Sequence, residues 1–250
     1  MKIDQGIFYS SIANYYNQIF PINEKQVDFV QAGLNKLDGK KILDIGCSTG
    51  QLANRLATFG AQVTAIDLNE EMIAIAQKEN HFPTLDFKTA NMLEVDSFAE
   101  ESTLDAALCF GNTLVHLDSI EEVSQFLKGM AKVLKPGAKL MIQILNYDYI
   151  LEHEVDELPL IDGPKISFIR KYDLPETAGE KIIFNTELVI KSSRESLFHA
   201  SRLLPLRKHD LHTLLEYNGF ERMKYYADFS KKPYGGNHLP LVVSAERSAS

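Results

Sequence analysis

A glycine-rich segment after a short apolar run constrains this chain more than any other feature. Residues 40–50 read KKILDIGCSTG, in which a predicted buried strand ends near Asp44 and is followed at once by Gly46 and Gly50. NAD, ATP and S-adenosylmethionine (SAM) are all nucleotides that a glycine-rich turn after a strand can hold. The segment therefore predicts a nucleotide-binding loop at the edge of a sheet, and the surrounding residues must decide which nucleotide binds.

The segments around this loop alternate between apolar strand-like runs and amphipathic helices. Asn69 is placed to cap one helix, and glutamates fill the first turn of the helix predicted over 119–134, with a tight turn at 135–140. Alternation of this kind predicts an α/β fold: a doubly wound, mostly parallel seven-stranded sheet of the Rossmann-like type. The predicted strands are residues 41–45, 61–67, 85–88, 104–110, 138–145, 223–226 and 239–247.

The pattern changes after Asn146. Residues 165–174, 180–190 and 197–206 show the alternation of antiparallel strands, and a turn-like PETAGE separates the first two. We therefore predict two units. Residues 1–146 and 205–250 form the nucleotide-binding domain with an N-terminal helical cap, and residues 147–204 form a β-rich insertion that caps the substrate. The insertion begins where the fifth strand ends, beside the crevice in which such folds bind ligands.

The charge balance indicates which partners to expect. The 250 residues carry 26 Lys and Arg against 34 Asp and Glu, a formal net charge of −8. Broad binding to nucleic acid depends on neutralising phosphates with basic residues, so this balance argues against nucleic acid and favours a small-molecule partner. A homo-oligomer is compatible with the sequence.

Targeting and metal-binding signals are missing from the sequence. The N-terminal MKIDQGIFYSS has no apolar core of a signal peptide, and no apolar run reaches the about 18 residues that would indicate a membrane span. The two cysteines, Cys47 and Cys109, have no metal-binding spacing, so no metal is expected and a reduced, cytoplasmic protein is predicted.

The loop residues discriminate among the three nucleotides. The segment lacks the GxGxxG of dinucleotide sites, and Gly50 precedes Gln51 where a phosphate loop needs a lysine. An aspartate before the first glycine would compete with a pyrophosphate for the helix N-terminus, but it suits an ammonium or a sulfonium, and SAM carries both. Asp67, at the end of the second strand, can accept both ribose hydroxyls. SAM satisfies both carboxylates, whereas NAD satisfies only Asp67.

A series of segments carries a family resemblance. In order and spacing, the chain resembles the successive motifs of class I SAM-dependent methyltransferases through ILDIGCSTGQLANRLA, VTAIDLNEEMIAIAQ, DFKTANMLEV, LDAALCFGNTLVHL and VLKPGAKLMIQ. Ser48 departs from the pattern, which usually has glycine there. CFGNTLVHL, NYDYIL and ADFSKKPYGGNHLPLVVSAER further resemble glycine N-methyltransferase and its small-molecule N-methyltransferase relatives.

The resemblance implies a role for each matching residue. On the cofactor, Asp44, Gly46, Cys47 and Gly50 would line the methionine end, Asp67 would bind the ribose, and Leu68, Asn91 and Met92 would contact the adenine. Phe110, Gly111 and Asn112 would approach the methionine moiety and the methyl group. Tyr16 would close over SAM, and Asn146 would lie on the acceptor side. The insertion differs from the glycine enzymes, so Arg170 and Arg202 are only candidates for meeting an acceptor carboxylate.

These roles predict methyl transfer by in-line displacement, with S-adenosylhomocysteine (SAH) as the product. An amine acceptor brings its own lone pair and needs no strong base, so Asn112 and Asn146 would orient it by hydrogen bonds, and Tyr16 and Phe110 would face the sulfonium. An oxygen acceptor needs a base, for which His116 is a candidate. We therefore predict a small-molecule methyltransferase acting at nitrogen. An O-methyltransferase, an RNA methyltransferase and a non-catalytic SAM-binding regulatory protein are the alternatives, and a nicotinamide oxidoreductase is a more distant one.

Overall fold

The central sheet has seven strands, as the sequence predicts. The computed structural model describes residues 5–177 and 179–249, and its main sheet has the order β10-β11-β5-β4-β1-β2-β3. The five strands β1–β5 run parallel, and β11 is antiparallel to both of its neighbours. The strands are β1 Lys41–Ile45, β2 Gln62–Asp67, β3 Leu85–Thr89, β4 Leu104–Cys109, β5 Leu134–Leu145, β10 Phe220–Tyr226 and β11 Pro240–Arg247.

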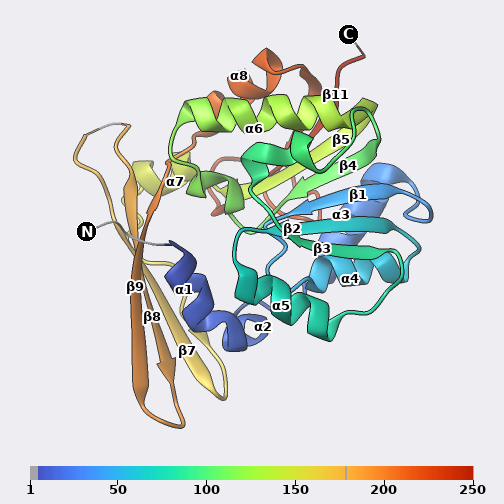
Figure 1. Ribbon diagram of the computed structural model, residues 1–250. Coiled ribbons are helices and arrows are strands. Elements are labelled where there is room, and N and C mark those ends of the chain that lie inside the picture. The colour runs from blue at the N-terminus through green and yellow to red at the C-terminus, as the bar shows by residue number, and fades with distance from the viewer. Residues whose placement is uncertain (1–4, 178, 250) are drawn as a thin grey trace.

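Helices cover both faces of this sheet (Figure 1). One face carries α3 (Glu24–Leu34), α4 (Gln51–Thr58) and α5 (Glu70–Glu79), and the other carries α6 (Ile120–Val133) and α8 (Lys208–Tyr217) with the 3₁₀ helix η2 (Met92–Ser97). The predicted cap is present: the side chain of Asn69 accepts a hydrogen bond from the first turn of α5. Ser119, for which no cap was predicted, does the same at α6. The predicted doubly wound α/β fold is therefore confirmed.

A second, antiparallel sheet lies beside the central one (Figure 1). It consists of β6 (Ile161–Asp162), β7 (Ile166–Asp173), β8 (Ile182–Ile190) and β9 (Glu195–Leu203), and it follows the short helix α7 (Tyr147–Glu152). The predicted small antiparallel β insertion is confirmed, and all its strands fall between residues 147 and 204. The boundaries that we predicted for the two units remain a prediction.

The N-terminal helices pack between the inserted sheet and α5 (Figure 1). These helices are α1 (Gln5–Ile12), the 3₁₀ helix η1 (Ala13–Tyr15) and α2 (Tyr16–Ile19). Ile12 and Ile19 are buried in one apolar cluster with Met72 of α5 and Phe168 of β7. Burial of these side chains fixes the N-terminal segment across the carboxyl ends of the parallel strands, where the glycine loop lies.

Two local details differ from the predictions. Residues 135–140 were predicted as a turn, but β5 already begins at Leu134, directly after α6, with an irregular register opposite Leu104. Gly137 lies within this irregular stretch and adopts a left-handed backbone conformation, with φ +76°, which glycine accommodates without steric cost. Helix α7 was not predicted, because its six residues are too few to show a helical period.

Among residues 5–177 and 179–249, every helix is too short or too polar to cross a bilayer.

Candidate active site

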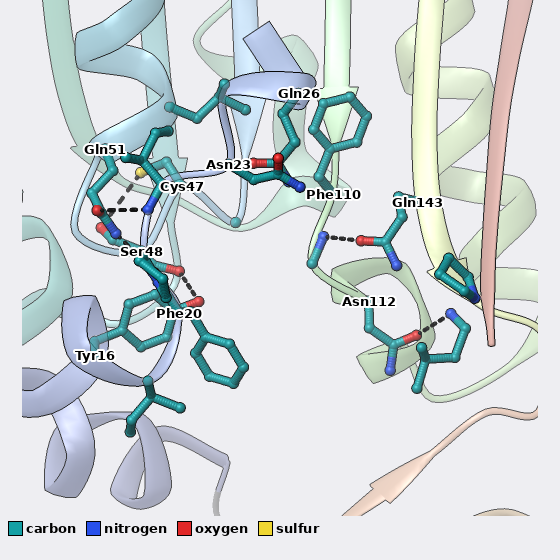
Figure 2. A pocket seen from close by; sticks show the side chains of 18 of the residues that line it. Tyr16, Phe20, Asn23, Gln26, Cys47, Ser48, Gln51, Phe110, Asn112 and Gln143 are labelled. Carbon is teal, nitrogen blue, oxygen red and sulfur yellow. Dashed lines mark hydrogen bonds between the residues drawn. The ribbon is translucent and has the colours of Figure 1, made fainter. Parts of the chain in front are cut away.

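The candidate site lies where the order of the central sheet reverses. β1 pairs with β2 on one side and with β4 on the other, so the chain leaves these strands in opposite directions. Ligands bind at such a switch point, outside the carboxyl ends of the strands. A cavity of about 640 Å³ lies there, between the loop after β1, the loop after β4, the N-terminal helices and the inserted strands β7 and β8. Figure 2 shows part of its lining, with Tyr16 and Ser48 on one side and Asn112 and Gln143 on the other.

The glycine loop is held by backbone hydrogen bonds and left-handed residues. The N–H groups of Gly46 and Cys47 both donate to the Ile66 carbonyl, at 2.8 and 2.9 Å. Gly46, Ser48 and Gly50 all have positive φ angles, of +71°, +50° and +77°. Ser48 therefore occupies a conformation that glycine adopts more easily, which gives a physical reason for the glycine usual at this position. Gly46 and Cys47 line the cavity, whereas Gly50 packs against Phe87.

Asp44 places a carboxylate with an unsatisfied oxygen in the cavity wall. Its side chain is 3% exposed, and its Oδ2 has no hydrogen-bond partner among residues 5–177 and 179–249. Burial, and then the nearby Asp67, raise the pKa of Asp44 to about 7. A buried carboxylate of this kind is stabilised by a cationic ligand, so Asp44 fits the ammonium or sulfonium of SAM.

Asp67 is held in place by the loop that it faces. Its two oxygens accept hydrogen bonds from the backbone N–H groups of Ser48 and Asn69, both at 2.9 Å. These bonds fix the carboxylate and leave lone pairs for further donors, such as ribose hydroxyls. Burial nevertheless raises the pKa of Asp67. Asp67 is not itself among the lining residues of the cavity, but its hydrogen-bond partner Ser48 is. Asp44 and Asp67 therefore fit a ligand that carries both a cation and a diol.

The predicted adenine-side residues lie at the ends of β2 and β3, outside the described lining of the cavity. Leu68 is 70% exposed, which is unusual for a large apolar side chain. Asn91 accepts a hydrogen bond from the N–H of Leu93 at 3.0 Å and so caps η2, which begins at Met92. Their predicted contact with the adenine remains a prediction.

Three of the four predicted catalytic residues line the cavity: Tyr16, Asn112 and His116. Asn112 is fixed on both sides, because its Oδ1 accepts from the Leu145 N–H at 2.9 Å and its Nδ2 donates to the Tyr147 hydroxyl at 3.1 Å. His116 Nε2 shares a hydrogen bond of 3.1 Å with the Tyr9 hydroxyl. Burial lowers the pKa of His116 to about 4, so the ring is neutral at neutral pH.

Asn146 is the exception. Its side chain is fully buried, and its Nδ2 donates to the carbonyls of Gly236 and His238, at 2.6 and 3.0 Å. Its Oδ1 accepts from the Tyr234 hydroxyl at 3.2 Å and from the first turn of α7. The structure therefore gives Asn146 a structural position, which ties β5 to the segment before β11, and does not bring it into the described cavity lining.

Phe110 and Gly111, predicted on the cofactor side, both line the cavity, and the lining also contains residues without a predicted role, among them Gln143, Phe168 and Tyr172. The Oε1 of Gln143 accepts from the Gly111 N–H at 2.9 Å and so holds the loop after β4 (Figure 2). Phe168 and Tyr172 reach the cavity from β7. Gln143 gives a sequence signal, since it is a polar residue in the apolar strand LMIQIL, whereas the strand pattern alone does not say which face of β7 meets the cavity.

The contact between Tyr16 and Ser48 gives a first testable prediction. The Ser48 hydroxyl donates to the Tyr16 hydroxyl at 2.8 Å, which joins the N-terminal helices to the glycine loop (Figure 2). Loss of one such bond costs about 0.5–1.5 kcal/mol, so Tyr16→Phe should weaken SAH binding about 2- to 10-fold in calorimetric titration. Tyr15→Phe is the matched control, because it removes a hydroxyl from the preceding residue, which does not line the cavity. Equal affinities for the two variants would show that this contact does not help to retain the ligand.

Comparison with known proteins agrees with this geometry. The family model described as "Methyltransferase domain" matches residues 42–137. A protein of Geobacillus sp. (strain WCH70) described as a "putative methyltransferase" is 36% identical over 189 residues, which cover 70% of this chain and 74% of that protein. A ubiquinone biosynthesis O-methyltransferase of Xanthomonas oryzae pv. oryzae is 33% identical over 129 residues, and the match spans about half of each chain (50% and 51%).

Among solved structures, a SAM-dependent methyltransferase from Clostridium acetobutylicum superposes with a TM-score of 0.79, covering 97% of this chain and 100% of that one at 14% identity. The sheet order and the site define the class I methyltransferase fold, which this likeness also shows. Together with the sequence matches, this places the chain in the family of class I SAM-dependent methyltransferases. The predicted enzyme class and the predicted cofactor, SAM, are thereby confirmed.

Proposed function

We propose that this enzyme transfers the methyl group of SAM to a nitrogen atom of a small-molecule acceptor. The observation that carries the choice of nitrogen is the state of His116, the candidate base on the acceptor side of the cavity. A base is efficient when its pKa lies near the working pH, and burial lowers the pKa of His116 to about 4. A neutral amine needs no such base, because its own lone pair attacks the methyl carbon.

The small size of the acceptor is supported by how the cavity is built. The inserted sheet and the N-terminal helices contribute lining residues opposite the ends of β1 and β4, so an acceptor must enter between them. The net charge of −8 also argues against a nucleic-acid acceptor.

In this mechanism the described residues position SAM and the acceptor and exclude water from the cavity. They do not transfer protons. SAM, when bound, supplies a methyl group on a positively charged sulfur. Asp44 and Asp67 would hold its cation and its ribose, and Asn112, fixed by Leu145 and Tyr147, would present one amide N–H to the acceptor side. With SAM bound, the lone pair of the amine would form the nitrogen–carbon bond, the pair of the broken carbon–sulfur bond would stay on sulfur, and the amine would then lose a proton to water. Holding the reacting atoms in line accounts for most of the acceleration.

An oxygen acceptor is the second candidate, and the similarity to the ubiquinone O-methyltransferase favours it. Neutral His116 would then have to take the hydroxyl proton. The two candidates predict different pH dependence of kcat/KM.

Measurement of the pH dependence of kcat/KM with pairs of acceptors distinguishes the nitrogen acceptor from the oxygen acceptor. For an amine, kcat/KM should rise tenfold per pH unit up to the pKa of that amine, so the inflection should move by about 2 units between an α-amine near 8 and an alkyl amine near 10. A protonated amine has no lone pair with which to attack the methyl carbon, so kcat/KM should rise with pH and not fall. His116→Asn should leave this inflection in place. A profile whose inflection stays fixed when the acceptor changes and disappears in His116→Asn would instead establish the oxygen acceptor.

A further inference from the structure

Two polar side chains on one face of β7 enter the cavity wall without full sets of partners. Phe168, Arg170 and Tyr172 alternate along the strand, so they share a face, and all three line the cavity. The Nε of Arg170 and the hydroxyl of Tyr172 are shielded from solvent and have no hydrogen-bond partner among residues 5–177 and 179–249. Buried polar groups are nearly always paired, so two such atoms two residues apart indicate a missing partner.

We propose that Arg170 and Tyr172 form the acceptor-binding end of the cavity and receive an anionic oxygen group, a carboxylate or a phosphate, carried by the methyl acceptor. This inference rests on the proposed function in that it names the class of the acceptor. It makes the substrate a small amine with an anionic group at its other end.

The sign of the ligand charge follows from the surroundings of Arg170. Its Nη2 donates to the Pro159 carbonyl at 2.6 Å, and its guanidinium lies 5.9 Å from the centre of the Phe168 ring. No carboxylate of the described residues forms an ion pair with it. A partly buried guanidinium that lacks a counter-ion is costly, and a carboxylate or phosphate is the group that its planar donor set matches best.

The neighbours of Tyr172 connect this end of the cavity to the methyl-facing loop. The Tyr172 ring packs on Phe184, with 5.3 Å between the ring centroids. Burial raises the pKa of Tyr147, and the electrostatic interaction with Tyr172 is the second largest cause of this rise. Tyr147 in turn accepts a hydrogen bond from Asn112, which follows β4. An acceptor held at Arg170 and Tyr172 would therefore extend toward Asn112, with its amine on the side of the loops that hold SAM.

Arg202, the other arginine of the insertion that was a candidate for an acceptor carboxylate, is not in a comparable position. It lies on β9, its side chain is exposed, and it is not among the lining residues of the cavity. The structure thus selects Arg170, and Arg202→Gln becomes a matched control that removes the same charge from the same sheet.

The test measures anion binding without turnover. Protein saturated with SAH is heated with acetate, benzoate or phenyl phosphate, each at matched ionic strength, with benzamide and phenol as neutral probes. We expect an anionic probe to raise the midpoint of unfolding, Arg170→Gln to abolish the rise, Tyr172→Phe to reduce it, and Arg202→Gln to leave it intact. The carboxylate and phosphate probes compared with each other tell which anion is preferred.

A second measurement covers turnover. In matched acceptor pairs, such as glycine with glycinamide and O-phosphoethanolamine with ethanolamine, Arg170→Gln should lower kcat/KM for the anionic member at least about 10-fold more than for the neutral one. Absence of any Arg170-dependent effect of all three anions would overturn the inference, as would a loss of SAH affinity in Arg170→Gln, which would assign the arginine to the cofactor. If the anions bind but no amine is methylated, the proposed nitrogen acceptor fails and the anion site stands.

Discussion

Asp44→Asn should abolish useful SAM binding and at the same time make the ligand-free enzyme more stable at pH 8. The substitution removes the buried charge that would face the cation of SAM, and truncated partners of buried charge pairs typically cost about 2–5 kcal/mol, so affinity should fall at least about 30-fold. Asparagine has the same shape and no charge. The carboxylate that it replaces is buried and has an oxygen without a partner among the described residues, so the ligand-free fold should gain stability from the change.

The gain should depend on pH in a defined direction. The pKa of Asp44 is raised to about 7 in the folded enzyme, whereas an unfolded aspartate has a pKa of about 3.9. Between these values the folded state binds more protons, so the free energy of unfolding of the wild type falls as pH rises from about 4 to about 7, and the loss remains in full above 7. Asp44→Asn should remove this slope, with a gain of about 1–4 kcal/mol at pH 8 and little change near pH 4. Thermal melts across this pH range, without ligand, measure it.

Asp105→Asn provides a control of the opposite sign. Asp105 lies near the start of β4, where it accepts hydrogen bonds from the Lys41 N–H and the Lys135 ammonium, both at 2.9 Å. Despite some desolvation, these partners lower its pKa, so the same substitution should reduce stability at pH 8. If Asp44→Asn also reduced stability at pH 8 while SAM binding persisted, Asp44 would be a structural loop residue and the cation-binding role would be lost.

Gly46→Ala should be the most damaging small substitution in the glycine loop. An added Cβ would lie 2.5 Å from both Oγ1 and Cγ2 of Thr113, and the residue would have to keep φ at +71°. The strain of a left-handed alanine costs about 1–2 kcal/mol and overpacking about 1–3 kcal/mol more. Because Thr113 also donates to the Phe110 carbonyl, at 2.7 Å, the clash should push the loops after β1 and β4 apart. We expect a loss of about 2–5 kcal/mol of stability and no measurable SAM binding.

Gly39→Ala isolates the backbone contribution. Gly39 has the same φ of +71°, but a Cβ there would meet nothing within 4 Å. It should cost only the left-handed strain, about 1–2 kcal/mol, and should leave SAM affinity unchanged in calorimetric titration. Equal effects of the two alanines would mean that the contact between Gly46 and Thr113 does not limit the loop.

The sequence predicted the structure best in segments whose conformation depends mainly on their own residues. The loop residues, the two strand-end aspartates and the succession of strands and helices along the chain follow from local patterns, because each apolar run, cap and glycine acts within a few positions of itself. Tyr16 and Asn112 were expected at the site because of a family resemblance, and His116 was expected there as a candidate base; all three line the cavity. They come from segments far apart in the chain, so no local pattern brings them together.

The acceptor side could not be predicted in the same way. The family resemblance implied an acceptor-side role for Asn146, but its side chain satisfies two carbonyls that lie about 90 residues further along the chain. Which face of β7 meets the cavity depends on how the inserted sheet sits on the N-terminal helices, and that packing depends on Ile12, Ile19 and Leu188 together. Such contacts between distant segments leave no periodic signal in any one of them.

The separate hydrogen bonding of the inserted sheet has a consequence for how this enzyme could change over evolutionary time. β6–β9 pair with one another and not with β1–β5. Replacement of side chains on the cavity face of β7 or β8, where the acceptor is proposed to bind, would leave in place the backbone hydrogen bonds of the strands that carry Asp44, Asp67 and the glycine loop. The acceptor could therefore change during evolution while binding of the methyl donor is retained, so that related enzymes would share one reaction and differ in their substrates.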